Sequence, residues 1–544
     1  MNAALRAKRI LRALDPNDDP SAEPVSPLAL AALAILTGVS VFLFLRWRFQ
    51  PMQDMGLHAS MAAVIAHYGE AGSIYPAIYK LDLLNTNSLF CTTAGLLGRI
   101  LPPWTAFRLV FALYLAGIPL ANLYALRTFG RSAWGAVVAV PLCYNVMYVY
   151  GFASFMFATP LAVLAIPLFY RLLVKPTIGR GAAVATVLVL LFLTHWHVFL
   201  WTGVLLFTMA LVGILVTAKK TLFGLPGTRP WTIAWVSAAA VVPSIALLTR
   251  WVWRSTKPPP ADEFTLMSIT NPSWQSFVRG IKPPSRSISE FWGLLDLTKN
   301  EGDARFFVWF FVLGILCIAI ARMHKWKRPP VLELACAVTC ASYFFMAEDF
   351  AGQQVIASRQ FGFGLYFAAV FFTPVPGSVS RLGRLTAVVA VTCLASLQLS
   401  NWARMLTKFE KEEVAGLEEV LAAAPPRKRL HYIKIEPDSK YFTAHAFWHV
   451  EKNYMLDKGG QVDENPAYYA MMPIRYRSAY TPHIIDAHVQ SWPGTMEIWE
   501  NFDLVLVHKW KPAAADLATA QKYGERIIQK GDWELWKSNV PQKR

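Results

Sequence analysis

Residues 27–58 read PLALAALAILTGVSVFLFLRWRFQPMQDMGLH, and this stretch sets the fold that we predict. Residues 27–45 carry no charge and are long enough for one helix that crosses a membrane. They are too long for the core of a signal peptide and lack a clear small-residue cleavage site, so we interpret them as an uncleaved anchor. The basic residues that precede them predict a cytoplasmic N-terminal tail over residues 1–26.

Uncharged stretches of similar length recur as far as Ser400. Of the 544 residues, 55% are apolar and 16% are charged, whereas soluble globular chains carry about 25% charged residues. These proportions exclude a disordered chain, a coiled coil and an ordinary cytosolic enzyme. We therefore predict a mainly α-helical, polytopic transmembrane bundle over residues 27–400, followed by a small α/β domain over residues 401–544. The eleven expected spans are 27–45, 104–126, 133–150, 152–170, 182–197, 199–217, 231–250, 304–321, 330–347, 360–375 and 384–400.

The charges of the short loops predict the orientation of these spans. Within the short loops, Lys and Arg fall on the side of the N-terminus, and Arg359 is the exception on the other side. The apolar run 83–101 would spoil this pattern as a span, so we interpret it as an interfacial or re-entrant helix. An odd number of spans places the loops 46–103 and 251–303 and the domain 401–544 together outside the cytoplasm. In a bacterium, this describes an inner-membrane protein with a periplasmic C-terminal domain.

Charge and cysteine content argue against several other classes of protein. The net charge is +17, but the basic residues form no long stripe interleaved with aromatic residues, so we predict no nucleic-acid partner. The six cysteines form no CxxC pair, and residues 401–544 contain none, so the sequence predicts neither a redox motif nor a disulfide-held outer domain. A glycine-rich phosphate loop and a Gly-x-Ser-x-Gly motif are also absent from the sequence.

Asp54 is the first candidate for chemistry. It follows Pro51, which ends the preceding helix, and it opens a stretch whose apolar spacing predicts an amphipathic helix on the membrane surface. His58 lies one turn further along the same helical face. A carboxylate held there can act as a general base, with His58 beside it. The alternative is an N-cap aspartate on a solvated loop.

The second candidate site is a break within residues 181–217. One helix of this length would measure about 55 Å, whereas the hydrocarbon core is about 30 Å thick. The polar group Thr194-His195-Trp196-His197 is where we expect the chain to turn. His195 and His197 would then line an outer cavity shared with Asp54, or would simply be interfacial turn residues beside an aromatic Trp196.

A third group, Glu348, Asp349 and Arg359, lies in a predicted outer loop. The Arg359 guanidinium suits the phosphate of a lipid-linked substrate, because its planar fork of donors matches phosphate oxygens. The alternative is a salt bridge from Arg359 to one of the two acids. Glu348 and Asp349 could instead hold a divalent cation such as Mg or Mn, which would be the only cofactor that the sequence suggests.

The remaining signals are weaker. Packing explains Tyr75-Pro76, Asn87, Tyr144-Asn145 and Tyr150-Gly151-Phe152 at least as well as function does. In the C-terminal domain, the pattern predicts strands at 430–435, 503–508 and 533–537 and a helix at 513–529. His445 and His449 are spaced for one helical face, but a zinc site is not predicted, because no Glu lies between them and no third ligand is evident.

The layout resembles the GT-C superfamily of membrane glycosyltransferases. The likeness covers the organisation of residues 27–400 and the trailing outer domain, and the order Asp54, His58, Asn87, Tyr144-Asn145, Tyr150-Gly151-Phe152, Thr194-His195 resembles an uncharacterised bacterial branch of it. In that superfamily, an acidic residue just after the first span serves as the catalytic base, and Asp54 matches this position. The paired acids that many members carry in the first outer loop are not found here.

The resemblance implies an inverting transfer of a sugar from a polyprenyl-phosphate donor to an acceptor glycan or lipid at the outer face. Asp54 would be the base, with His58 beside it, and Arg359, His195, His197 and Tyr75 would bind the substrate or its phosphate. Membrane lipids and the lipid-linked donor are the implied partners. Two other classes stay open, a non-catalytic transporter or flippase and an assembly protein of cell-envelope glycoconjugates, although charges within the centres of spans, which would favour transport, are almost absent.

Overall fold

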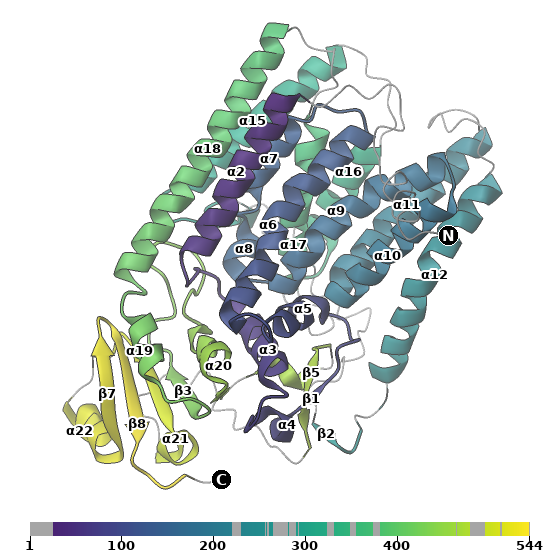
Figure 1. The fold of residues 1–544 in the computed structure, drawn as a ribbon. Coiled ribbons are helices and arrows are strands. Elements are labelled where there is room, and N and C mark those ends of the chain that lie inside the picture. Colours follow the sequence, from purple (N-terminus) through teal and green to yellow (C-terminus); the bar gives the residue numbers. More distant parts are fainter. Residues whose placement is uncertain are drawn as a thin grey trace.

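The computed structural model describes residues 26–219, 230–255, 257, 260–264, 281, 290–291, 293–323, 331–348, 355–373, 381–463, 465–469, 471–478, 496–511 and 514–542. A bundle of long helices forms one end of the molecule, and the sheets lie at the other end (Figure 1). Every expected span falls on a helix or on a broken pair of helices. These are α2 (Pro27–Arg46), α6 (Pro103–Thr128), α7 (Gly135–Leu142) with α8 (Val146–Tyr150), α9 (Ala153–Val174), α10 (Ile178–Thr194), α11 (Trp196–Lys219), α12 (Pro230–Ser255), α15 (Gly302–Met323), α16 (Val331–Phe345), α17 (Ile356–Phe371) and α18 (Arg381–Glu412).

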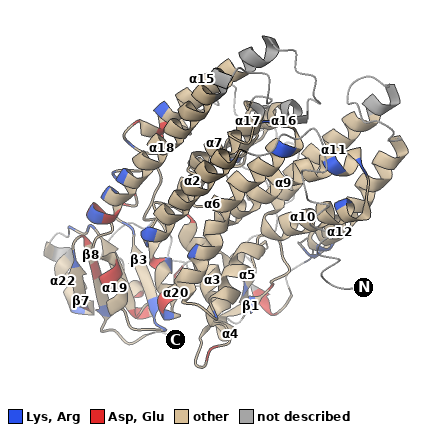
Figure 2. Ribbon diagram, turned by 45° about the horizontal axis from the view of Figure 1, so that its top comes forward, with Lys and Arg blue, Asp and Glu red and all other residues tan. Residues whose placement is uncertain are grey.

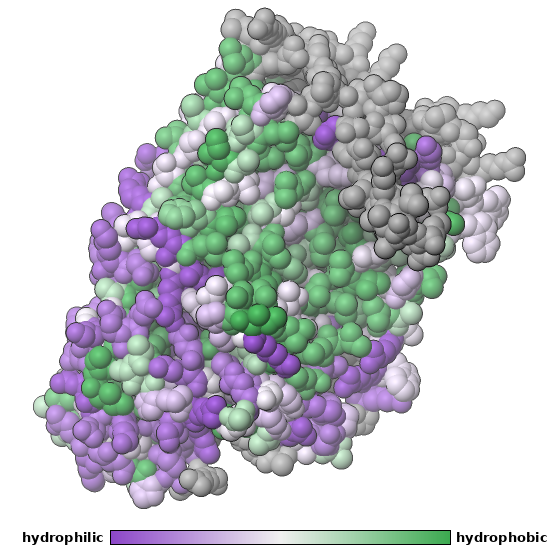
Figure 3. Space-filling model, in the orientation of Figure 1, coloured by the Kyte–Doolittle hydropathy of each residue, from purple (hydrophilic) through white to green (hydrophobic). Residues whose placement is uncertain are grey.

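The surface of the bundle has the character of a lipid-facing protein. Within the described residues, six helices are long and apolar enough to cross a membrane. On α12, Trp231 and Trp253 are 76% and 62% exposed near its two ends, about 33 Å apart along an ideal helix, which matches the thickness of a bilayer core with aromatic residues at both interfaces. Figure 3 shows apolar residues over the helices and polar residues over the C-terminal domain. The protein is therefore an integral membrane protein, as predicted.

The predicted break within residues 181–217 is confirmed. α10 ends at Thr194, His195 caps it in an extended conformation, and α11 begins at Trp196. The apolar run 83–101 forms only a short helix, α5 (Leu89–Leu97), whose length of about 14 Å is too small to cross the membrane.

The helix after Asp54 differs from the predicted surface helix. α3 (Met55–His67) is buried along most of its length, because it packs between α5 and the C-terminal elements η2 (Val450–Lys452) and α20 (Asn453–Lys458). The sequence predicted an amphipathic helix on the membrane surface, and this expectation is wrong because the outer domain covers the face assigned to water.

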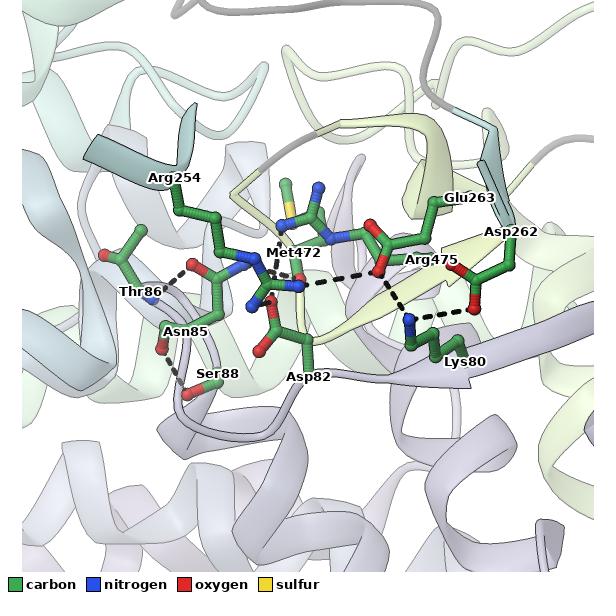
Figure 4. Close-up of polar contacts among 10 residues, drawn as sticks. All are labelled: Lys80, Asp82, Asn85, Thr86, Ser88, Arg254, Asp262, Glu263, Met472 and Arg475. Atoms are coloured by element: carbon green, nitrogen blue, oxygen red, sulfur yellow. Dashed lines mark hydrogen bonds and ion pairs between the residues drawn. The ribbon is translucent and has the colours of Figure 1, made fainter. Parts of the chain in front are cut away.

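Three outer segments meet in one small antiparallel sheet. Its order is β1 (Tyr79–Leu81), β5 (Ile474–Arg477) and β2 (Glu263–Phe264), and a short helix, α4 (Tyr75–Ile78), precedes β1. Around this sheet, Asp82 lies 2.9 Å from Arg254 and 3.4 Å from Arg475, and Lys80 lies 3.0 Å from Glu263 (Figure 4). The described parts of 46–103, 251–303 and 401–544 that form this sheet thus lie on the same side of the bundle, which is the arrangement that the loop charges predict.

The C-terminal domain is the predicted small α/β unit. Its sheet has the order β4 (Gln461–Val462), β3 (Arg429–Ile433), β6 (Leu504–His508), β8 (Trp533–Ser538) and β7 (Gly524–Lys530), with β3 parallel to both β4 and β6. Short helices complete it: α19 (Leu417–Ala423), η3 (Pro466–Tyr468), α21 (Met496–Asn501) and α22 (Ala514–Tyr523). The three predicted strands are confirmed. Acidic residues, sparse on the long helices, gather in this domain and near β1 (Figure 2).

Two details of this domain differ from the predictions. The helix expected over 513–529 is wrong in its second half, because α22 ends at Tyr523 and β7 follows to form a hairpin with β8. α18 also runs without a break across residue 400 to Glu412, so the bundle and the outer domain share one helix (Figure 1).

Candidate functional site

The position of Asp54 is fixed by a segment almost a hundred residues further along the chain. Asp54 precedes the first turn of α3, and its backbone N–H donates to the carbonyl of Tyr150 at 2.9 Å. Gly151 adopts the left-handed conformation at φ +71°, and a methyl group there would lie 3.0 Å from the Asp54 nitrogen. The carboxylate is 21% exposed, so it is held against protein on one side while water reaches it on the other.

Arg359 contacts the same segment. Its side chain is buried in the first turn of α17, with Cζ 4.1 Å above the ring of Phe152, which follows Gly151. Nη1 lies 3.2 Å from Nε2 of His195, and the negative charges of Asp54 and Glu348 both act on the guanidinium. The structure therefore brings Asp54, His195 and Arg359 together at one end of the helix bundle.

The helix break holds α17 through two consecutive residues. Gln360 Nε2 lies 2.8 Å from Nε2 of His197, just as Arg359 meets His195. Because arginine only donates, Nε2 of His195 must accept, so this imidazole is neutral with its proton on Nδ1. Both Nδ1 atoms are buried and have no hydrogen-bond partner among the residues that the structure describes. A neutral imidazole fixes the guanidinium without offsetting its charge.

His58 contacts Ser154 and Cys91. Its Nδ1 lies 3.3 Å from the Ser154 hydroxyl and 3.8 Å from the Cys91 sulfur. Burial, with a smaller contribution from the positive charge of Arg359, lowers the pKa of His58 to about 3. The ring is therefore neutral at physiological pH and packs the outer end of α9 against α3.

The other predicted residues lie in different settings. Glu348 accepts hydrogen bonds from the hydroxyl and backbone N–H of Ser358 at 2.8 and 3.3 Å, which secures the start of α17. Asp349 lies outside the described residues. In the described part of the chain, no group of three His, Cys, Asp or Glu side chains is arranged to hold a metal ion. Tyr75 is fully buried and donates to the carbonyl of Gly460 at 2.7 Å, so it joins α4 to the C-terminal domain.

His449, which the sequence suggested only as a partner of His445, lies beside Asp54. His449 Nε2 lies 3.8 Å from Asp54 Oδ1, and the His449 side chain is buried. It lies in a turn before η2 and not on the helical face that its spacing to His445 suggests. No local pattern could have found this contact, because it depends on how the C-terminal domain packs on α3.

Comparisons with known proteins agree with this architecture. No family model and no curated protein sequence matches the chain. Two solved structures of ArnT from Cupriavidus metallidurans do. The one bound to undecaprenyl phosphate has a TM-score of 0.55 at 11% identity and covers 95% of this chain and 99% of its own. The apo form has a TM-score of 0.52 at 12% identity and covers 95% and 98%.

This chain has the GT-C fold. The likeness extends over the bundle and the outer domain alike, so the fold predicted from residues 27–400 and their trailing domain is confirmed. Within the GT-C fold, Asp54 comes directly after the first long helix, and Arg359 and His195 close the same outer site from α17 and from the α10–α11 break. At 11–12% identity, the likeness concerns the fold, and the chemistry is argued from the residues.

Proposed function

We propose that this protein is an inverting glycosyltransferase that transfers a sugar from a polyprenyl-phosphate donor to an acceptor hydroxyl at the outer face of the membrane. The observation that carries the proposal is the meeting of a partly exposed carboxylate, Asp54, with a buried guanidinium, Arg359, at one outer site. A base and an anion-binding cation on either side of one site are what this reaction requires. The ArnT neighbour was solved with undecaprenyl phosphate, which supports a carrier of the same class here.

The proposed reaction is a single displacement. Asp54 accepts the proton of the acceptor hydroxyl while the hydroxyl oxygen bonds to the anomeric carbon of the sugar. The bond from that carbon to the phosphate oxygen breaks, and the phosphate leaves with the electron pair. One attack from the opposite side inverts the anomeric configuration. The products are the glycosylated acceptor and polyprenyl phosphate, and the exposed side of Asp54 lets the proton pass to water.

Arg359 stabilises the negative charge that the leaving phosphate gains. Its direction is set before the substrate arrives, because His195 holds one end of the guanidinium and the Phe152 ring lies beneath its plane. Such preorganisation favours the transition state over the bound donor, since no further ordering is needed during the reaction. His197 and Gln360 hold the adjoining turn of α17.

The proposed orientation follows the loop charges. The N-terminus lies in the cytoplasm, and the site, the β1–β5–β2 sheet and the C-terminal domain lie outside it, which in a bacterium is the periplasmic side of the inner membrane. A reporter fused after Arg544 should then be active only outside the cytoplasm.

The test uses the full-length protein in lipid nanodiscs with a panel of undecaprenyl-phosphate-linked hexoses and pentoses. We expect release of undecaprenyl phosphate from at least one donor, and Asp54→Asn should abolish it while leaving the Kd for undecaprenyl phosphate unchanged. Asp532→Asn, in the exposed turn between β7 and β8, is the matched control and should behave as wild type. Carrier binding without turnover of any donor would reject the enzyme and favour a transporter or an assembly protein.

A further inference from the structure

The C-terminal domain reaches the candidate base through a single turn. This turn, residues 443–449, connects the region after β3 to η2, and its last residue, His449, places Nε2 3.8 Å from Asp54 Oδ1. The His449 side chain is 6% exposed. This separation allows a polar interaction between the two groups in the resting protein, and contacts of catalytic groups often shorten further in the reacting complex.

Close packing fixes this turn against the start of α3. Gly56 lies two residues after Asp54, and a methyl group on it would be 2.0 Å from the carbonyl oxygen of His449. At the other end of α3, His67 Nε2 lies 3.0 Å from the carbonyl of Leu456 in α20. The C-terminal domain thus holds both ends of the helix that carries Asp54, and the histidine is placed by backbone contacts and not by a mobile side chain.

The environment of His449 keeps its ring neutral. Burial holds the pKa of His449 well below its usual range, and the positive charges of Lys452 and Lys434 act in the same direction. Its Nδ1 is buried without a partner among the described residues. With its proton on Nε2, a neutral imidazole can donate to the carboxylate. It adds no positive charge that would weaken Asp54 as a base, and Arg359 is already a nearby cation.

We infer that His449 is a positioning residue that orients the Asp54 carboxylate, so that the C-terminal domain completes the catalytic site. The donor on Nε2 engages Oδ1 and leaves the other carboxylate oxygen directed at the acceptor hydroxyl. The inference rests on the proposed function in one respect, that Asp54 is the base. It assigns the C-terminal domain a part in the chemistry, whereas the resemblance between folds leaves its role open.

The experiment compares His449→Leu, which fills the space without a donor, with His449→Gln, whose amide N–H reaches nearly as far as Nε2. His445→Ala is the matched control, because His445 lies in the same turn, is half exposed and contacts Asp438 and Trp448 instead. All are made in the full-length protein, and melting temperatures establish that each variant folds. Should His449→Leu not fold, His449→Met makes the same test with a more adaptable side chain.

Two readouts separate orientation from packing. The first is kcat and donor KM with whichever undecaprenyl-phosphate-linked sugar turns over. The second is the pH midpoint of carbodiimide labelling of Asp54, measured by mass spectrometry, which needs no turnover. We expect His449→Leu to lower kcat about 10–100-fold at an unchanged KM and to raise the labelling midpoint by about one pH unit, because the carboxylate loses a donor. His449→Gln should keep most of the wild-type kcat and a labelling midpoint close to that of the wild type. His445→Ala should change neither kcat nor the midpoint.

Gly56 tests the same contact from the side of α3. Gly56→Ala forces the His449 carbonyl away and should lower kcat in the same way as His449→Leu, whereas Gly69→Ala adds a methyl group in open space and should have no effect.

The outcomes distinguish this inference from the proposed function. If the wild type releases undecaprenyl phosphate from no donor, the proposed function fails, and the labelling midpoint still decides whether His449 acts on Asp54. If turnover is found but His449→Leu leaves both kcat and the midpoint unchanged, the inference is overturned. Equal losses of kcat in the Leu and Gln variants with an unchanged midpoint would indicate packing alone and would also overturn it.

Discussion

Two clusters of charged residues lie on the side of the bundle that carries the C-terminal domain, and they are built on different principles. Around the β1–β5–β2 sheet, acids and cations contact each other directly, as Asp82 does with Arg254 and Arg475 (Figure 4). In the Asp54 site, the charged groups face neutral imidazoles: Arg359 meets His195, and Asp54 lies beside His449. Charges that are paired with each other hold segments together. Charges that face neutral donors and acceptors remain uncompensated, so they can act on a ligand.

The sharpest test of this contrast changes one aspartate in each cluster. Asp54→Asn should lower kcat by about 10²–10⁴-fold, the range expected for loss of a general base, with an unchanged melting temperature. Asp82→Asn should lower the melting temperature and leave kcat per folded molecule unchanged. Turnover assays and thermal unfolding on the two variants check this, and a comparable loss of kcat in both would remove the distinction between the clusters.

Arginines from the two clusters give the next largest difference. Arg359→Ala should weaken binding of undecaprenyl phosphate by about 10–100-fold, because a charge-assisted contact to phosphate is lost, and Arg359→Lys should weaken it much less. Arg475→Ala should leave this Kd within twofold, since its partner is Asp82. Isothermal titration with undecaprenyl phosphate in nanodiscs measures all three, and equal Kd values for wild type and both Arg359 variants would exclude a phosphate-binding role.

Stability of the ion-paired cluster should respond in a coupled way. The Asp82 and Arg475 side chains are largely buried at 12% and 8% exposure, whereas Arg254 is 39% exposed. Removing Asp82 should therefore cost about 2 kcal/mol, mostly through the guanidinium of Arg475 that loses its partner. A double-mutant cycle of Asp82→Asn and Arg475→Met should show a coupling energy of similar size, and strictly additive effects would contradict a direct contact.

The last comparison concerns pH. Burial lowers the pKa of His58 to about 3, whereas a histidine in the unfolded chain titrates near 6.5. Between these values the unfolded chain binds more protons, so stability falls as the pH decreases through this window, by up to about 1.4 kcal/mol per pH unit for each such histidine. The melting temperature should decline below pH 6.5, and His58→Gln should make the decline shallower. Catalysis should show no histidine titration between pH 6 and 8, since His58 and His449 stay neutral.

The sequence predicts those features that depend on local composition. Uncharged runs long enough to cross a membrane mark the long helices, and the polar residues of the α10–α11 break mark the turn at His195. Asp54 is found by its place after the first span, and Arg359 by its unusual charge in an outer loop. Both features can be predicted because apolar length and loop charge depend only on neighbouring residues and on how each of them interacts with the bilayer.

Features made by distant contacts could not be predicted. The burial of α3 depends on the domain that covers it, and His449 meets Asp54 only because that domain packs on Gly56. β7 follows α22 without a break in the polar pattern, since its outer face is exposed and only pairing with β8 decides its conformation. The catalytic and binding roles of all the predicted site residues stay predictions, and Tyr75 is engaged with the carbonyl of Gly460.

The order of strands in the β1–β5–β2 sheet has a consequence for assembly during synthesis. The central strand, β5, is contributed by residues 474–477, while its two neighbours emerge from the ribosome hundreds of residues earlier. Since the described β1 and β2 pair with β5 and not with each other, neither gains its backbone partner until nearly the whole chain has been translocated. Contacts of such long sequence separation form late. A nascent chain that stops after α18 would therefore have an inserted bundle with an uncovered surface, because the sheet forms only once residues 474–477 have been synthesised.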